Sequence, residues 1–293
     1  MKRRIVILLA VVVLLAITVV PALAITNGQP DGDNHPYVGL MVAQAANGNP
    51  LWRCSGTLIS ETLFLTAGHC TEAPADHVVI WFDSGSPTEI PIGTGYPAAG
   101  PNRCAGITGY PCTGFDAAGT PYPHPDFCIG CGNGLPGFAS HDVGVVVLDP
   151  AYPASQYGVL PTEGFVDTLK NKTAIDFVGY GVNDQAQIPG NLLPQPPPYF
   201  RWFGLRTRMY APTELVSGKF VHSGEFMRLA LNPGGGSGGT CFGDSGGPDL
   251  LAGTATVLAV NSYVTNVNCS GVGYSARVDN PGNLSWIESF LGP

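Results

Sequence analysis

The segment Gly243–Pro248, which reads GDSGGP, is the part of the chain best suited to covalent chemistry. A serine hydroxyl is a useful nucleophile only when a base removes its proton and nearby donors stabilise the oxyanion that forms. The glycines around Ser245 allow a sharp backbone turn and let N–H groups come close to a substrate carbonyl. The segment therefore predicts a nucleophilic serine that transfers acyl groups.

The base that activates Ser245 must lie earlier in the chain. In α/β-hydrolases, which share the Gly-x-Ser-x-Gly pattern, the histidine follows the serine, but no histidine follows Ser245. His69 lies just after the apolar stretch Leu63–Thr66, and Asp142 directly precedes the apolar run Val143–Leu148. Because a carboxylate at the mouth of a buried strand can orient an imidazole, His69 and Asp142 are the favoured partners.

Other histidines have weaker claims. His35 and His124 each precede a proline in turn-like sequence and are expected to be solvated loop residues, whereas His77 opens an apolar strand. His141 neighbours Asp142, but adjacent residues of a strand point to opposite faces.

The elements that must position these residues are short strands. Apolar stretches rich in Val, Ile, Thr and aromatic residues, bounded by turn residues, are typical of an all-β sandwich or barrel. They cover Tyr37–Ala43, Thr57–Ile59, Leu63–Thr66, His77–Phe82, Val143–Leu148, Thr173–Val178, Phe226–Leu231 and Ala255–Asn261. A C-terminal helix is expected over Asn283–Leu291, with Asn283 as its N-cap. Asp149–Pro161 is the predicted linker, and Gly93–Gly137 and Pro189–Pro198 are predicted surface loops.

The first 24 residues have the features of an export signal. Lys2, Arg3 and Arg4 precede an apolar run over Ile5–Val20, and Pro21–Ala24 ends in a small-x-small cleavage pattern. The run is slightly short for a membrane span of about 20 residues, so a secreted chain is expected, with an uncleaved anchor as the alternative. All eight cysteines lie beyond this segment, as suits a disulfide-bonded exported protein.

The formal net charge of the chain is −8. Removal of the cationic first segment makes it more negative. Nucleic acids and anionic membrane surfaces attract proteins with Lys/Arg patches, so neither is an expected partner.

Three motifs occur in a specific order along the chain. Thr66–Cys70 (TAGHC), His141–Val145 (HDVGV) and Gly243–Pro248 resemble the histidine, aspartate and serine motifs of the chymotrypsin/trypsin-like serine protease family. The resemblance implies an all-β fold of two six-stranded antiparallel β-barrels, over residues 25–152 and 153–293, with the active site in the cleft between them and a C-terminal helix. Residues 93–137 would be a Cys-rich loop insertion in the first barrel.

The resemblance also implies the catalytic roles. Ser245 would attack the scissile carbonyl, His69 would transfer protons, and Asp142 would orient the imidazole. The backbone N–H groups of Gly243 and Ser245 would form the oxyanion hole. No metal or organic cofactor is required.

Substrate-binding residues follow from the same resemblance. Ser262, Tyr263 and Val264 are similar to the edge strand that pairs with extended substrate, although an ordinary strand without substrate contact remains the alternative. The specificity pocket would have Gly239 and Thr240 at its floor and Val264 and Gly273 at its neck. A floor without a carboxylate would leave a basic side chain buried and unpaired, so we expect cleavage after uncharged, small to medium apolar residues.

Activation and disulfides complete the implied picture. The N-terminal Ile25, exposed by signal cleavage, would insert its α-ammonium beside Asp244 and so order the site. The resemblance pairs Cys54 with Cys70 and Cys241 with Cys269. Three pairings are open for the remaining cysteines, and closeness in sequence favours Cys104–Cys112 with Cys128–Cys131.

Together these features predict a secreted, monomeric serine endopeptidase that acts on protein or peptide substrates. The alternative is a protease-like binding protein without catalysis, although all three triad residues are present. A subtilisin-like enzyme that uses Asp31 or Asp33 is disfavoured, because the chain lacks the alternating βα pattern of that fold.

Overall fold

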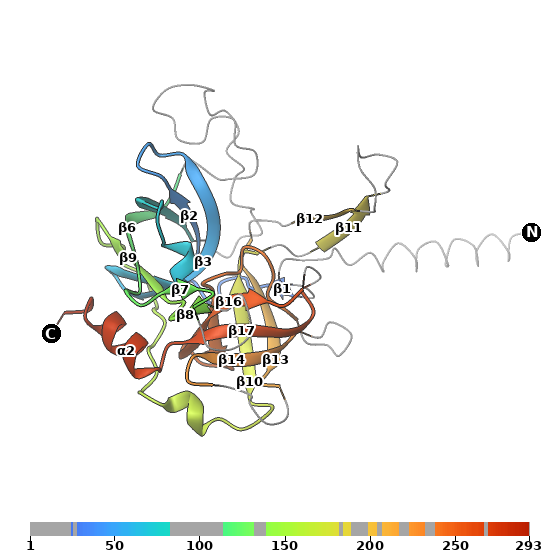
Figure 1. The fold of residues 1–293 in the computed structure, drawn as a ribbon. Helices are drawn as coiled ribbons and strands as arrows, with labels where there is room; N and C mark the ends of the chain where they lie inside the picture. The colour runs from blue at the N-terminus through green and yellow to red at the C-terminus, as the bar shows by residue number, and fades with distance from the viewer. Residues whose placement is uncertain are drawn as a thin grey trace, which may run out of the picture.

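The computed structural model describes residue 25 and residues 28–82, 114–131, 139–181, 184–188, 199–203, 207–216, 223–231, 238–266 and 269–292. These residues form two β-lobes and a C-terminal helix (Figure 1). The predicted signal 1–24, the predicted loop 189–198, Cys104 and Cys112 lie outside the described residues. Within the described ranges, no helix is both long and apolar enough to cross a membrane.

Six antiparallel strands close the first lobe into a barrel, in the order β2-β3-β4-β9-β6-β5. The ring closes because β5 pairs with β2. The strands are β2 (Val38–Gln44), β3 (Pro50–Ser60), β4 (Leu63–Thr66), β5 (His77–Trp81), β6 (Ala117–Pro123) and β9 (Gly144–Leu148).

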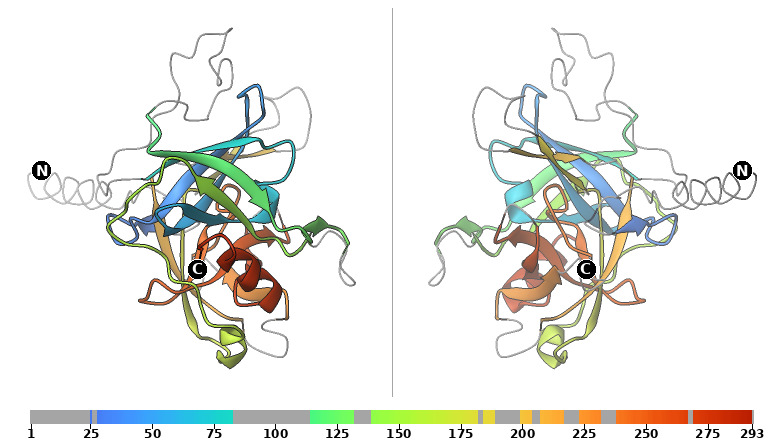
Figure 2. Two further views of the ribbon diagram at one scale, coloured as in Figure 1. Left: turned by 90° about the vertical axis from the view of Figure 1, so that its left-hand side faces the viewer. Right: turned by 90° about the vertical axis from the view of Figure 1, so that its right-hand side faces the viewer.

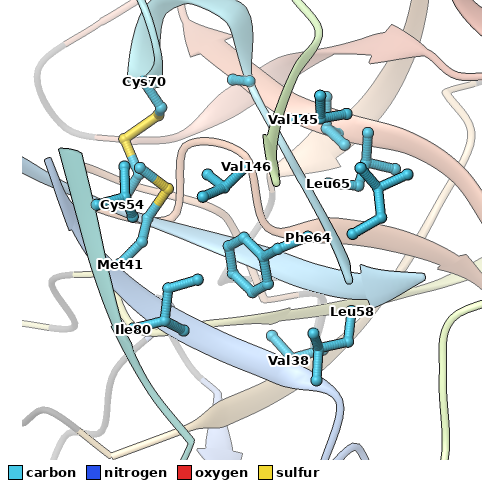
Figure 3. Close-up of a cluster of buried hydrophobic side chains, with 14 of the residues drawn as sticks. Val38, Met41, Cys54, Leu58, Phe64, Leu65, Cys70, Ile80, Val145 and Val146 are labelled. Atoms are coloured by element: carbon cyan, nitrogen blue, oxygen red, sulfur yellow. A yellow bond between two sulfur atoms is a disulfide. The ribbon is translucent and has the colours of Figure 1, made fainter. Parts of the chain in front are cut away.

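The core of the first barrel is apolar. Figure 3 shows Phe64 among the side chains of Val38, Leu58 and Ile80, all of which are fully buried. Burying one such side chain stabilises the fold by about 1.5–3 kcal/mol. The Cys54–Cys70 disulfide lies at one side of this cluster.

Part of the predicted loop at 93–137 is a barrel strand, which corrects that prediction. Strand β6 pairs with β5 and β9, and its Gly119 lies opposite Val78 on one side and Leu148 on the other. A Cβ atom at Gly119 would clash with the backbone of Val147, so a glycine is needed at this close approach. The sequence of β6, AAGTPYP, lacks the β-branched run by which strands are usually recognised.

A curled sheet of seven strands forms the second lobe, in the order β1-β13-β10-β15-β16-β17-β14. Its first member is the two-residue strand β1 (Gln29–Pro30). The other six strands run from β13 to β14, and an isolated bridge between Leu215 and Leu229 joins these two strands' ends of the sheet. The prediction of an all-β fold with two antiparallel lobes is therefore confirmed, with the first barrel closed by a full ladder and the second by a single bridge. The other strands are β10 (Ala174–Gly179), β13 (Met209–Glu214), β14 (Phe226–Leu231), β15 (Pro248–Leu251), β16 (Val257–Val264) and β17 (Gly271–Arg277).

The C-terminal helix α2 covers Pro281–Glu288 and begins earlier than predicted. Its N-cap is Asn280, whose side chain accepts a hydrogen bond from Gly282 N, and Asn283 is a buried residue inside the helix. The helix packs against the first barrel, because Trp286 lies edge-on to His124 and Phe290 contacts Tyr122. Figure 2 shows this helix below the strands of that barrel.

Smaller elements complete the described chain. They are two short hairpins, β7 (Cys128–Ile129) with β8 (Ala139–Ser140) and β11 (Asp184–Ile188) with β12 (Tyr199–Phe203), and the 3-10 turns η1 (Gly68–Cys70) and η2 (Phe165–Thr168).

A buried ion pair ties the N-terminal segment to the second lobe. Arg208 is fully buried and donates from Nε to Asp31 Oδ2 at 2.8 Å and from an Nη to Gly32 O at 2.8 Å. Asp31 also contacts the ring of His35. His35 is therefore held in a charged cluster, and the prediction that it is a solvated loop residue is wrong.

Candidate active site

The 3-10 turn η1 directly follows strand β4 and carries His69. Its last residue, Cys70, forms a disulfide with Cys54 of the neighbouring strand β3. Trp52 donates from Nε1 to Cys70 O at 2.9 Å, which fixes the same turn a second time. A closed disulfide loop of this length contributes about 3 kcal/mol in the chain-entropy model, so His69 sits on a firmly held turn.

Asp142 approaches His69 from the start of the Val143–Leu148 segment. The His69 ring contacts the carboxylate through Nδ1, at 2.9 Å from Oδ2 and 3.1 Å from Oδ1, and His69 N donates to Oδ1 at 2.8 Å. Asp142 is only 1% exposed. Such a bond favours the tautomer in which Nδ1 carries the proton and Nε2 can accept one.

The two groups shift each other's pKa in opposite directions. Burial raises the pKa of Asp142, but the charge and hydrogen bonds of His69 and the Ser262 hydroxyl outweigh it, so the net pKa is lowered. Burial lowers the pKa of His69, but Asp142 and Glu72 raise it above its ordinary value. The pair therefore favours an aspartate anion beside an imidazole that protonates readily.

Ser262 has a second role that sequence reasoning missed. Its hydroxyl donates to Asp142 Oδ2 at 2.5 Å, from strand β16 of the second lobe. A carboxylate buried between lobes needs donors from both sides, so Ser262 supports Asp142 from the side opposite His69. The sequence resemblance had marked this residue only as part of a substrate-pairing strand.

A histidine pair supports the backbone just before Asp142. His141 has a positive φ of 47°, its ring nitrogen Nδ1 lies 2.8 Å from Asn283 Oδ1, and its ring stacks on His124 with centroids 4.6 Å apart. His124 is 5% exposed, and burial together with His141 lowers its pKa. The prediction that His124 is a solvated loop residue is therefore wrong, because helix α2 covers it.

Ser245 lies on a loop that packs directly onto the His69 side of the molecule. Ser55 N donates to Ser245 O at 2.8 Å, and the Ser55 hydroxyl donates to Gly243 O at 3.0 Å. Gly246 has a φ of 77°, and a Cβ atom there would clash with Thr66 Oγ1. The glycine after Ser245 is therefore needed for the two lobes to meet at the site.

Ser245 and His69 line the same cavity of about 440 Å³. Between these two described residues the structure shows no hydrogen bond. Catalytic hydrogen bonds are often long in substrate-free structures and tighten when substrate binds.

The Ser245 loop also presents backbone donors. Gly243 has a φ of 94°, and Asp244 N donates to Cys241 O at 3.0 Å. By contrast, no acceptor for the N–H groups of Gly243 and Ser245 is found among the described residues. These are the two groups that the sequence predicts as oxyanion donors.

Asp244 and Ile25 are both fully buried. Asp244 accepts hydrogen bonds from Gly181 N at 2.7 Å and Cys241 N at 2.9 Å. Burial raises its pKa to about 7, against the lowering effects of those bonds and of the Arg53 charge. Ile25 packs with apolar residues of the second lobe, among them Phe177, and its nitrogen is bonded to Ala24 in this uncleaved chain. The predicted ion pair therefore belongs to a chain cut before Ile25.

A smaller cavity of about 160 Å³ adjoins Ser245 on the second lobe, where specificity was predicted. It is lined by Thr240, Cys241, Phe242, Ser245, Asn261, Ser262, Tyr263 and Val264, with no carboxylate among them. Gly239 is buried beside this set without lining it. Gly273 lies opposite Val264 in the β16–β17 ladder.

The structure contains three disulfides among the described cysteines. Besides Cys54–Cys70 these are Cys128–Cys131 and Cys241–Cys269. The last one joins the Ser245 loop to the segment just before β17. Ile129, inside the Cys128–Cys131 loop, lines the cavity of His69 and is 57% exposed. The sulfurs of Cys54 and Cys70 lie near the His69 ring, but they are bonded to each other and offer no thiolate to a metal.

No known protein-family model and no curated protein sequence matches the chain. Solved structures do match. One is HL collagenase, with a TM-score of 0.63 and 17% identity over 92% of this chain and 99% of that chain. Another is human heparin binding protein, with a TM-score of 0.56 and 16% identity over 92% and 98%. The chain therefore has the chymotrypsin-like fold that its three motifs predicted.

Proposed function

We propose that this chain is a secreted serine endopeptidase that hydrolyses peptide bonds through an acyl-enzyme on Ser245. The observation that carries the proposal is the placement of His69, which binds the buried Asp142 through Nδ1 and shares a cavity with Ser245. A serine, a histidine and an aspartate that are far apart in sequence line this cavity, and these are the residue types that acyl transfer uses as nucleophile, base and orienting group.

The reaction follows from these positions. Ser245 Oγ attacks the scissile carbonyl carbon while its proton passes to Nε2 of His69, and the carbonyl oxygen becomes an oxyanion that accepts from the N–H groups of Gly243 and Ser245. When the C–N bond breaks, His69 returns the proton to the leaving amine. Water then attacks the ester with His69 again as base, and the acid is released. Asp142 stabilises the imidazolium at each stage.

The small cavity beside Ser245 supports a preference for uncharged residues before the scissile bond. Its lining offers hydroxyl, amide and apolar groups and no carboxylate. A lysine or arginine buried there would lose its hydration without gaining a partner, at a cost of several kcal/mol. Val264 narrows the wall of the cavity, which favours small to medium apolar side chains.

Signal cleavage before Ile25 would complete the site. The new α-ammonium could pair with Asp244, whose full burial otherwise disfavours its anion. The ion pair would hold the Gly243–Ser245 donors in place. The division into two domains at about residue 152 and the monomeric state belong to the same proposal.

The proposal is tested by Ser245→Ala in the secreted protein, measured with uncharged fluorogenic peptides. We expect kcat/KM to fall by at least about three orders of magnitude while the fold is retained. A folded Ser245→Ala variant that keeps near wild-type turnover would overturn the assignment.

The second candidate function is binding without catalysis, since one structurally similar protein is a heparin binding protein. Heparin is polyanionic, and a chain with a formal net charge of −8 repels it. Retention on immobilised heparin at physiological salt, together with no hydrolysis of any peptide, would favour this candidate.

A further inference from the structure

The cavity that holds His69 and Ser245 has a permanent cation in its wall. Arg53 lies on strand β3, directly before Cys54, and lines the cavity. Its guanidinium packs against Gly243, because a Cβ atom on that glycine would lie 3.3 Å from Arg53 Nε and 3.6 Å from an Nη. The guanidinium of Arg53 therefore lies beside Gly243, which is two residues before the proposed nucleophile Ser245.

The position of Arg53 relative to Ser245 indicates which part of a substrate it meets. The smaller cavity, on the Thr240 and Val264 side of Ser245, does not include Arg53. Arg53 belongs instead to the wall that contains the Cys54–Cys70 disulfide and the turn of His69. An acyl group seated in the smaller cavity would leave the amine part of the substrate to run along that wall.

Two carboxylates line the same cavity as Arg53, and the Arg53 charge also acts on the buried Asp244. Asp142 is buried and engaged by His69 and Ser262. Glu72 lines the cavity next to His69 and acts on that ring. Arg53 presents a planar fork of N–H donors, which is the group best matched to a carboxylate.

We propose that Arg53 selects substrates that carry a carboxylate on the first or second residue after the scissile bond. The inference rests on the proposed function, because it deepens the specificity of the same site. Carboxylates of two origins share this chemistry: an aspartate or glutamate side chain, and the C-terminus of a short leaving peptide. Arg53 lies close to the predicted oxyanion donor Gly243. The preference for a carboxylate should therefore appear in the rate of cleavage as well as in the binding of the peptide.

The test uses matched internally quenched peptides with Glu, Gln or Lys at the first, second or third leaving-group position and an amidated end. A further pair has a two-residue leaving group with a free or amidated C-terminus. We expect kcat/KM to be about tenfold higher for Glu than for Gln at the first or second position. Arg53→Gln should abolish this ratio, Arg53→Lys should keep part of it, and Arg53→Glu should reverse it in favour of Lys.

Controls separate this inference from the proposed function and from a structural role. Lys172→Gln, at an exposed ion pair with Glu214, should leave the ratio unchanged. Binding of the same peptides to Ser245→Ala, measured by fluorescence anisotropy, should show the Glu preference without any hydrolysis. Equal rates and equal binding for Glu and Gln peptides would overturn the inference even if hydrolysis is normal. If peptides bind with the Glu preference but wild-type protein cleaves none, the proposed function fails and the Arg53 site stands.

Discussion

The two lobes hold their parts of the site in different ways. The first barrel is closed by complete ladders and filled with apolar side chains, and it fixes the His69 turn with a disulfide. The second lobe buries polar and charged groups, among them Asp244 and Asp249, and a single bridge closes its sheet. A buried apolar side chain needs no hydrogen-bond or charge partner, whereas a buried carboxylate does.

Under the proposed function, the difference predicts an acid–base half of the site that is complete in the uncleaved chain and a nucleophile half that is not. His69 and Asp142 already satisfy each other. Asp244 is buried with two backbone donors, and no cation lies within ion-pair distance of it among the described residues. Changes to the N-terminus and to the buried carboxyls of the second lobe are therefore expected to have the larger effects.

The largest expected effect comes from the N-terminus. A chain that starts at Ile25 should be at least about 100-fold more active than one that retains Ala24, because breaking a buried charge pair costs about 3–5 kcal/mol. Asp244→Asn should reduce the activity of the mature chain to a similar extent and leave the extended chain almost unchanged. Kinetics on the four proteins, with each N-terminus verified by mass spectrometry, measures this. Equal activity of the two wild-type forms would mean that the Ser245 loop is already in its active arrangement before cleavage, and would contradict the proposed ion pair.

The same carboxyl predicts how stability varies with pH in the extended chain. The pKa of Asp244 is raised from an ordinary 3.8 to about 7, so its contribution to stability is fully present below about pH 4 and is lost as pH rises through 7. Thermal unfolding between pH 4 and 8 should show this loss in the extended chain, and Asp244→Asn should reduce it.

A second buried carboxyl should have an intermediate effect. Asp249 is fully buried, and neither of its oxygens has a hydrogen-bond partner of ordinary geometry among the described residues. Burial raises its pKa well above the ordinary value, with Ser275 opposing the shift. Asp249→Val should raise the free energy of unfolding by about 1–3 kcal/mol at pH 8.

Denaturant titration measures the Asp249 effect, and Asp76→Val, at an exposed position, is the matched control. A loss of stability in Asp249→Val but not in Asp76→Val would show that the buried carboxyl has a favourable partner. The two lobes would then differ less in how they hold their buried groups.

The smallest expected effect concerns the first barrel. The pKa of His69 is raised by Asp142 and, less strongly, by Glu72. Since the base must be neutral, kcat/KM should rise with pH through an apparent pKa above 6.5, and Glu72→Gln should move that limb to lower pH by less than Asp142→Asn does. An unchanged pH dependence of kcat/KM in Glu72→Gln would show that Glu72 does not influence the pKa of His69.

The sequence could predict those features that are encoded in short stretches of the chain. Strands that are largely apolar, such as β4, β9 and β14, were predicted nearly to their bounds. Strand β6 was missed because small residues and prolines fill it. His69, Asp142 and Ser245 could be proposed as the site because each lies in a recognisable local motif. The support from Ser262 and Asn283 could not be found, because it depends on contacts between residues more than 100 positions apart.

The charged cluster of Arg208 and Asp31 was missed for the same reason. The two residues are 177 positions apart, and neither lies in an apolar run that would predict burial. An arginine is normally exposed. Only the pairing of β1 with β13 brings the segments of Asp31 and Arg208 together.

Under the proposed function, Ser245 is a nucleophile activated by His69. The most direct measurement is labelling of the mature chain with a fluorophosphonate, followed by peptide mapping of the modified residue. We expect one stoichiometric label on Ser245 in the wild-type protein and labelling slowed by at least about 100-fold in His69→Ala. A folded mature chain that takes up no label, or is labelled equally fast without His69, would contradict the proposed function.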